Sequence, residues 1–522
     1  MNSYDLIRLQ KRGILFHLDI HFANFMAEIA GDKIPGLLLA AALVSSYTRQ
    51  GHVCLDLSKL EGKRLLEEEE PIICPKLNKW LDDLRKSSVV GDPGEYKPLI
   101  IDKKARLYLY RYWDYQEKLA EAIKRLAWEN ENNIDHDKLK AGLERIFPSA
   151  QSDDIDWQKV AAFAALTRKF CVISGGPGTG KTLTVAKILT LLLEQVHPKS
   201  LRIALTAPTG KAAARLQEVV RKAKEKLNCS EIIKESIPEE ASTIHRLLGS
   251  IPGSPYFHHN EKNPLPVDVL VVDEASMVDL ALMSKLVRAL PKEVRLILLG
   301  DKDQLSSVEA GAVLGDICDT GNVHNFSRQF SMLLEKVTGY RIPSEGQKIP
   351  KTMINDSIVQ LQKSYRFGVK SGIGALSQAV KEGDSNRAFA LLKSGDYPDI
   401  KWKDLPKGSY FSTSIKSQIL RGYSDYLKAD EPREIFRLFE CFRILCAIRE
   451  GPYGVFALNS LTELILKEQK LITPERRWYR GRPILITRND YQLQLFNGDA
   501  VSYTHLRAHE TSLHLVCRLL LE

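Results

Sequence analysis

The first candidate for chemistry is a glycine-rich segment that ends in lysine and threonine. Its members are Gly175, Gly176, Pro177, Gly178, Thr179, Gly180, Lys181 and Thr182. An apolar run (170–175) precedes it and a helical pattern follows, which is the context that a phosphate-binding loop requires. The glycines let backbone N–H groups cradle phosphate oxygens, Lys181 would reach the β- and γ-phosphates, and Thr182 would hold Mg²⁺. We therefore predict a nucleotide site rather than a glycine-rich turn that binds nothing.

An acidic pair at the end of a second apolar run is the natural complement of this loop. Asp273 and Glu274 close the run VDVLVVDE (267–274). Asp273 would hold Mg²⁺ through water, and Glu274 would polarise the attacking water. Alone, the pair would be read as a solvated strand terminus. With the phosphate loop about ninety residues earlier, it predicts NTP hydrolysis.

A glutamine after a third apolar run is a candidate sensor. Gln304 belongs to GDKDQL (300–305), directly after VRLILLGD (294–301). A buried amide on the same sheet edge as the nucleotide could respond to the γ-phosphate and report its presence elsewhere. The alternative is a surface turn, which Gly-Asp and Asp-x-Asp would suit equally well.

Two further segments could contact a polyanion. Pro208, Thr209 and Lys211 lie where a strand passes into a helix, whose N–H groups would face a phosphate backbone. Thr243 and His245 add a hydroxyl and an imidazole that could contact single-stranded DNA. The basic residues after Lys211 are more simply a solvated face, and a lone histidine is more often structural.

Bulk composition sets the frame for these sites. The 522 residues are 44% hydrophobic and 27% charged, which is typical of a globular protein with about three or four domains. The formal net charge is +9, an excess too small to identify a partner. The eight cysteines include no CxxC pair, so we expect reduced thiols. No secretory signal or membrane span is visible, which predicts a cytoplasmic protein without a membrane partner.

The elements that must position these residues alternate along the chain. Four apolar runs separated by helical patterns lie between about 150 and 320. Such runs fit strands buried on both faces, and hence a parallel sheet covered by helices in an α/β fold. Residues 320–357 are polar and suggest a linker, and a second mixed segment covers 358–500.

These motifs, in this order, resemble the RecD family of bacterial exodeoxyribonuclease V subunits. The matching segments are WQKVAAFAALTR (157–168), GGPGTGKT (175–182), APTGKAAARL (207–216), STIHRLLG (242–249), VLVVDEASMVD (269–279), GDKDQLSSVEAGAVLGDIC (300–318), LQKSYRF (361–367), REGPYGVFALN (449–459), GRPILITRND (481–490) and LFNGD (495–499). The resemblance implies a superfamily 1 helicase that uses ATP to move 5′→3′ on DNA in double-strand-break repair and recombination. It implies that Gln158 reads adenine and that Arg366 reaches the γ-phosphate from the second motor lobe.

The resemblance also implies an architecture and partners. It predicts a P-loop NTPase with two RecA-like lobes, an N-terminal helical or mixed domain and an incomplete C-terminal part. The expected divisions are 1–115 for docking on RecC, 116–345 for the first lobe, 346–480 for part of the second, and 481–500 for the start of a small β domain. RecB and RecC would complete a heterotrimer that carries the nuclease, and residues 250–266 match a strand-separating element. The alternatives are a stand-alone RecD-like helicase and a P-loop module that switches on ATP without moving.

The last residues depart from the family pattern. Residues 501–522 contain three of the twelve histidines and do not resemble the RecD family, in which a T-x-H-K-x-Q-G motif is expected after this point. We expect a foreign or frame-shifted tail, with a divergent natural C-terminus as the alternative.

Overall fold

The chain forms two compact units in a computed structural model. The described residues are 3–31, 34–66, 71–128, 134–148, 154–196, 201–305, 307, 309–319, 324–342, 353–368, 370–406, 410–473, 479–486, 500–502 and 517–519. The first unit comprises Met1–Pro208 and Ala212–Arg366, and the second comprises Thr209–Lys211 and Phe367–Glu522. Across the described part of the chain, no helix is both long and apolar enough to cross a lipid bilayer.

The N-terminal part of the first unit is mixed helix and sheet, as expected. Its helices are α1 (Ser3–Lys11), α2 (His17–Ala30), α3 (Leu37–Arg49) and α4 (Leu77–Arg85). Its strands are β1 (Cys54–Asp56), β2 (Val90–Gly91), β3 (Leu99–Ile101) and β4 (Arg106–Leu109), in the order β1-β4-β3-β2. Trp80 is fully buried in this core, and its indole N–H donates to the carbonyl of Gly36 at 3.2 Å.

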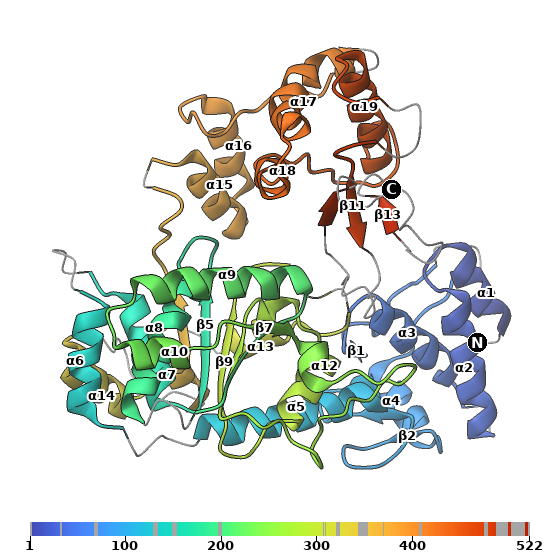
Figure 1. Ribbon diagram of the computed structural model, residues 1–522. Helices are drawn as coiled ribbons and strands as arrows, with labels where there is room; N and C mark the ends of the chain where they lie inside the picture. The colour runs from blue at the N-terminus through green and yellow to red at the C-terminus, as the bar shows by residue number, and fades with distance from the viewer. Residues whose placement is uncertain are drawn as a thin grey trace. The chain divides into compact units, whose positions relative to one another are not determined.

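A six-stranded parallel sheet forms the centre of the first unit, which confirms the P-loop NTPase fold class (Figure 1). Its strands are β5 (Phe170–Gly175), β6 (Ile203–Ala207), β7 (Ala241–Thr243), β8 (Val269–Val272), β9 (Arg295–Gly300) and β10 (Ile358–Leu361), in the order β10-β5-β9-β8-β6-β7. Parallel pairing brings the carboxyl ends of all six strands to one edge. The loops that follow the strands therefore gather there.

Strand residues are apolar on both faces because helices cover both faces. Cys171 and Ile173 of β5 point into one hydrophobic cluster, whereas Phe170 and Val172 point into the other. The first face packs against α6 (His136–Ile146), α7 (Trp157–Thr167), α8 (Lys181–Gln195), α9 (Gly210–Lys226) and α14 (Arg328–Thr338). The second face packs against α5 (Tyr110–Trp128), α11 (Ile244–Leu248), α12 (Leu280–Arg288) and α13 (Val313–Cys318). The alternation of side chains along each strand thus fills two cores at once.

Three expected boundaries differ from the structure. The predicted linker at 320–357 contains α14, whose Phe330 and Leu334 are buried in the sheet's core. The second lobe was expected from 346, but β10 pairs with β5 and so belongs to the first sheet. The first lobe was expected from 116, but α5 begins at Tyr110 and packs on α12. The segment 320–357 is polar on average, but apolar residues at helical spacing within it form one face of α14, and that face is buried.

The second unit is helical with one small sheet. Its elements are α15 (Gly372–Lys381), α16 (Ser385–Ser394), α17 (Tyr410–Lys428), α18 (Pro432–Phe439), α19 (Val455–Glu468), β11 (Pro483–Ile486), β12 (Ala500–Ser502) and β13 (Cys517–Leu519). Both strand pairings here are antiparallel, so the parallel sheet expected for a second lobe is not seen in the described residues of this unit. Apolar residues at helical spacing, such as Ile415, Ile419 and Tyr426, explain the helices. Most of the predicted tail, 503–516 and 520–522, lies outside the described residues.

Candidate active site

The phosphate loop connects β5 to α8 at the carboxyl edge of the sheet. Gly178 (φ 79°) and Gly180 (φ 82°) adopt the left-handed conformation, which glycine enters without steric cost. A Cβ at Gly180 would lie 2.5 Å from Nε2 of Gln158. Two of the predicted loop glycines are therefore required by the backbone and by its close neighbours.

Lys181 opens α8 with its ammonium group turned back onto the loop. Its Nζ donates to the carbonyl oxygens of Gly175 and Gly176. Burial lowers the pKa of Lys181, and the nearby carboxylate of Asp301 opposes this effect most strongly. A cation held in this position is placed to meet phosphate oxygens at the N-terminus of a helix.

Thr182 and Asp273 meet although they come from different strand ends. Thr182 Oγ1 donates to Asp273 Oδ2 at 3.2 Å, and Asp273 Oδ1 accepts from the backbone N–H of Glu274 at 2.9 Å. Asp273 is buried, and this burial raises its pKa. A hydroxyl beside a carboxylate supplies the hard oxygen donors that Mg²⁺ prefers, so the pair fits the predicted metal position.

Glu274 occupies an unusual backbone conformation. Its φ of 51° and ψ of 40° are left-handed, a region that non-glycine residues occupy mainly where the surroundings enforce it. Burial raises the pKa of Glu274, and the negative charge of Asp273 raises it further. A carboxylate with a raised pKa accepts a proton more readily, which suits the predicted role of polarising water.

The structure adds two charged residues to the site. Asp301, which directly follows β9, is buried and acts electrostatically on Lys181. Arg215 of α9 acts electrostatically on Lys181, Asp273 and Glu274. For Asp301, the signal was its place after a strand that neighbours β5. Arg215 belongs to the basic helix for which the sequence favours a solvated face, and no sequence pattern distinguishes Arg215 from the neighbouring cations.

Gln304 is exposed, so the expectation of a buried amide is wrong. Its backbone N–H donates to the carbonyl of Asp301 at 3.2 Å, and the N–H of Asp303 donates to Asp301 Oδ1 at 3.2 Å. These bonds form a tight surface turn, in agreement with the alternative interpretation of Gly-Asp and Asp-x-Asp. The turn still lies at the carboxyl edge, because β9 pairs with β5.

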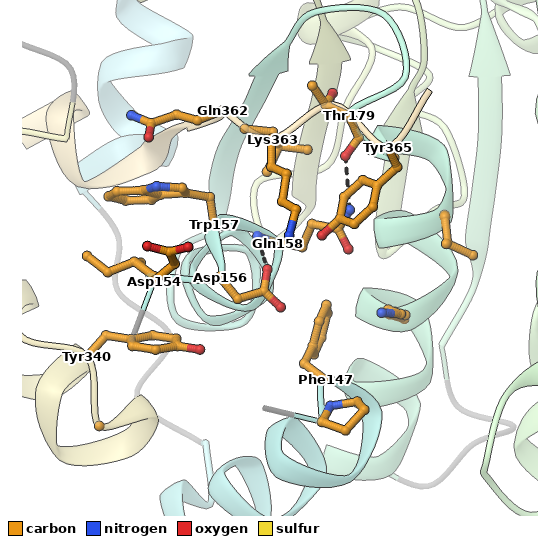
Figure 2. Close-up of a pocket in the computed structure, with 17 residues that line it drawn as sticks. Phe147, Asp154, Asp156, Trp157, Gln158, Thr179, Tyr340, Gln362, Lys363 and Tyr365 are labelled. Atoms are coloured by element: carbon orange, nitrogen blue, oxygen red, sulfur yellow. Dashed lines mark hydrogen bonds between the residues drawn. The ribbon is translucent and has the colours of Figure 1, made fainter. Parts of the chain in front are cut away.

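A cavity of about 660 Å³ opens beside the loop, with Gln158 in its wall (Figure 2). Gln158 is buried, and its Nε2 donates to the carbonyl of Thr179 at 2.9 Å. Aromatic residues Phe147, Trp157 and Tyr365 also line the cavity. Rings and a fixed amide in a concave site are suited to a planar heterocycle.

Arg366 lies next to the phosphate loop. The N–H of Tyr365 donates to the carbonyl of Gly178 at 2.8 Å, and Ser364 Oγ donates to the carbonyl of Pro177 at 3.2 Å. A Cβ at Gly178 would lie 2.4 Å from Cβ of Arg366. Arg366 is therefore the last residue of the first unit, whereas the resemblance implied that it belongs to the second lobe. The cause is β10, which carries the segment onto the sheet.

Two of the predicted DNA-contacting residues lie at the same carboxyl edge. Pro208 follows β6 and Thr243 ends β7, with Ala207 paired to Thr243. The Thr243 hydroxyl accepts from the backbone N–H of Arg246 at 3.2 Å and so caps α11. His245 is exposed, and its ring lies edge-on to Phe257.

Thr209 precedes α9 and the exposed Lys211 lies in its first turn. The predicted strand-separating element (250–266) contains two short bridges, Ser250 to Phe257 and Asn260 to Asn263. Its contact with a nucleic acid remains a prediction.

Comparison with known proteins identifies the family. A family model described as the N-terminal domain of RecBCD enzyme subunit RecD matches residues 11–108, and a model of the AAA domain matches residues 158–310. The RecBCD enzyme subunit RecD of Haemophilus influenzae is 35% identical over 543 residues, which cover 95% of this chain and 83% of that protein. The chain belongs to the RecD family. The resemblance drawn from the motifs is thereby confirmed.

Two further relatives show how far the RecD family match extends. The RecBCD enzyme subunit RecD of Mycobacterium tuberculosis (strain H37Rv) is 36% identical over 495 residues, covering 93% of this chain and 77% of that protein. The ATP-dependent RecD2 DNA helicase of Deinococcus radiodurans is 43% identical, but over 146 residues that cover 28% of this chain and 17% of that protein. Similarity to RecBCD subunits therefore spans nearly the whole chain, whereas the similarity to RecD2 is local.

Proposed function

We propose that this chain is the ATP-dependent 5′→3′ DNA helicase subunit of a RecBCD-type exodeoxyribonuclease V. It acts on single-stranded and duplex DNA in double-strand-break repair and homologous recombination. The observation that carries the proposal is the meeting of Lys181, Thr182, Asp273 and Glu274 at one sheet edge, in a chain whose N-terminal residues match a RecD-specific domain.

Each residue at this edge has a separate role in ATP hydrolysis. Lys181 binds the phosphates, and Thr182 with Asp273 would hold Mg²⁺, which neutralises developing charge on the phosphate oxygens when bound. Glu274 orients the attacking water and accepts its proton. Arg366, beside the loop, offers a guanidinium to the γ-phosphate.

The orientation of Gln158 favours adenine. Because a carbonyl oxygen can only accept, the bond from Nε2 to Thr179 fixes the amide nitrogen on that side. Oε1 is then the atom available to the cavity. An acceptor at this point suits the exocyclic amino group of adenine, which supports ATP as the nucleotide.

Coupling to DNA follows from the shared sheet edge. Pro208 follows β6 and Thr243 ends the neighbouring β7, and Gln304 follows β9, which pairs with the strand before the phosphate loop. A change in the nucleotide would therefore shift loops that face DNA. We assign Pro208, Thr209, Lys211, Thr243 and His245 to DNA contact, and Gln304 to communication between nucleotide and DNA.

An exposed apolar stripe on α2 supports partner binding. Leu18, Phe25 and Ile29 are 68%, 56% and 48% exposed, and their spacing of seven and four residues places them on one helix face. Apolar side chains gathered on a surface usually mark an interface. We assign this stripe to RecC, with RecB as the other subunit, and propose that the complex works in the cytoplasm.

The stand-alone helicase alternative is less well supported. The RecD-specific N-terminal match covers 11–108, whereas similarity to RecD2 is limited to 28% of the chain. The ATP-switch alternative shares the same nucleotide site, so only movement on DNA separates it from a helicase.

Strand separation tests this proposal. Duplexes with a 5′ or a 3′ single-stranded tail would be incubated with the purified chain, ATP and Mg²⁺, alone and with RecB and RecC. We expect the chain to unwind the 5′-tailed duplex and not the 3′-tailed one. ATP binding without unwinding of either duplex, in the complex as well, would instead support an ATP switch.

A further inference from the structure

Asp156 immediately precedes α7 and also lines the cavity. Its Oδ1 accepts from the backbone N–H of Gln158 at 2.9 Å and of Lys159 at 3.4 Å, so it caps the helix. It is also one of the cavity-lining residues, and Figure 2 shows its carboxylate turned toward the space between Tyr365 and Phe147. One oxygen is engaged by the helix, and the other faces the cavity.

Two groups that line the cavity are close enough to Asp156 for its charge to act on them. The charge of Asp156 acts on the hydroxyl of Tyr365 and on the ammonium of Lys187. Both residues line the same cavity, and Lys187 Nζ lies 4.2 Å from the ring centroid of Phe147. Asp156 is therefore placed among the aromatic residues that would enclose a base, with a cation nearby to balance its charge.

Asp156 and Gln158 present the same kind of atom to the cavity. Gln158 offers Oε1, since its Nε2 is bonded to Thr179, and Asp156 offers a carboxylate oxygen. Two acceptors that line one cavity match a group with two N–H bonds. The 6-amino group of adenine has two, whereas guanine carries a 6-keto oxygen that both acceptors would repel.

We propose that Asp156 is a specificity-determining residue that, together with Gln158, selects adenine over guanine nucleotides through the 6-amino group. This inference rests on the proposed function of the cavity as the ATP site. A bond to a charged acceptor is stronger than one between neutral groups, and a site whose polar groups are left unpaired rejects the mismatched substrate. We therefore expect Asp156 to contribute about 10- to 100-fold to the preference for ATP over GTP.

The alternative role for Asp156 is helix capping alone, and asparagine separates the two roles. Asparagine caps helices about as well as aspartate, because its carbonyl oxygen can accept the same N–H bonds. Its amide nitrogen would then replace the free oxygen with a donor, which suits the keto group of guanine. Asp135 provides a matched control, since it caps α6 by accepting from Asp137 and Lys138 and is not among the cavity-lining residues.

The experiment measures equilibrium binding of ATP and GTP, by competition with a fluorescent ATP analogue, to wild type, Asp156→Asn and Asp135→Asn. We expect the ratio of the two Kd values to fall about 10- to 100-fold toward GTP in Asp156→Asn and to stay unchanged in Asp135→Asn. Asp156→Ser, which caps but withdraws the acceptor, should weaken ATP binding without improving GTP binding.

An unchanged Kd ratio in folded Asp156→Asn and Asp156→Ser would overturn the inference and leave the ATP site intact. A wild-type chain that binds neither nucleotide would contradict the proposed function instead. Thermal unfolding of each variant shows whether the helix cap has been preserved. If Asp156→Asn lowers Tm but leaves the ratio of the two Kd values unchanged, the residue acts only as a helix cap.

Discussion

Thr182 and Asp273 stand ninety-one residues apart in the sequence, yet the threonine hydroxyl donates to the aspartate carboxylate at 3.2 Å. The contact forms because β5 and β8 both flank β9, so that the residues after them reach the same edge of the sheet. It places a hydroxyl and a carboxylate where one divalent cation could bind both.

Replacing Asp273 with Asn should reduce ATP hydrolysis by about 100-fold or more, because the charge that would balance Mg²⁺ is lost while the shape is kept. The steady-state rate as a function of Mg²⁺ concentration is the measurement. Asp279→Asn is the control, since Asp279 caps α12 by accepting from Leu282. An unchanged Mg²⁺ dependence in Asp273→Asn would remove Asp273 from the metal site.

Gly178→Ala should weaken nucleotide binding through a steric clash, in addition to the loss of stability caused by backbone strain. An alanine there would be left-handed and would press on Cβ of Arg366 at 2.4 Å. Gly253→Ala isolates the strain, because Gly253 has a φ of 72° and an added Cβ would meet nothing within 4 Å. Strain alone costs about 1–3 kcal/mol. We expect both variants to have lower Tm values, but only Gly178→Ala to lose ATP affinity; equal affinities would show that the loop tolerates the contact.

The rate of ATP hydrolysis should depend on the ionisation of Glu274. Burial and the charge of Asp273 raise its pKa above the ordinary 4.5, and only the deprotonated form can accept a proton from water. The rate should therefore fall as the pH drops through this raised pKa. A pH profile of kcat measures it, and an acidic limb centred at or below pH 4.5 would show that another group limits the rate. Glu274→Gln should bind ATP but hydrolyse it poorly at every pH.

Much of the site could be predicted because it depends on local rules. A glycine-rich loop between an apolar strand and a helix, and an acidic pair ending another such strand, bring the residues predicted to bind phosphate and metal to one sheet edge through parallel pairing. The structure brings Lys181, Thr182 and Asp273 together as those rules require.

Other features could not be read from the sequence because they depend on packing between distant segments. The exposure of Gln304 follows from a turn closed on Asp301, and its sequence allowed either outcome. Arg366 is beside the loop because β10 joins the first sheet. The segment before β10 is polar, so the sequence did not indicate that β10 belongs to that sheet. The role of Arg215 depends on which side of α9 is turned toward Lys181, Asp273 and Glu274, and the other cations of that helix make Arg215 indistinguishable in the sequence.

The stripe on α2 should be required for assembly and not for folding. Leu18→Ser with Phe25→Ser removes two exposed apolar side chains, so Tm should change little. Co-purification with RecC should be lost. Ile232→Ser, which removes a 58% exposed side chain from α10 (Glu231–Ser236), is the control and should leave the complex intact. Retention of RecC by the double variant would place the interface elsewhere.

The central claim is that this site uses ATP to drive movement on DNA, and DNA-stimulated ATPase activity tests it most directly. Hydrolysis would be measured for the wild-type chain and Lys181→Ala, each with and without single-stranded DNA. Lys181 is the first residue of α8, and its ammonium bonds only to carbonyls of the preceding loop among the contacts described for it, so the variant should fold normally. We expect single-stranded DNA to raise the wild-type rate many-fold, and Lys181→Ala to show no hydrolysis with or without DNA. The claim would be contradicted if the wild-type rate of ATP hydrolysis were the same with and without single-stranded DNA, or if Lys181→Ala were as active as wild type.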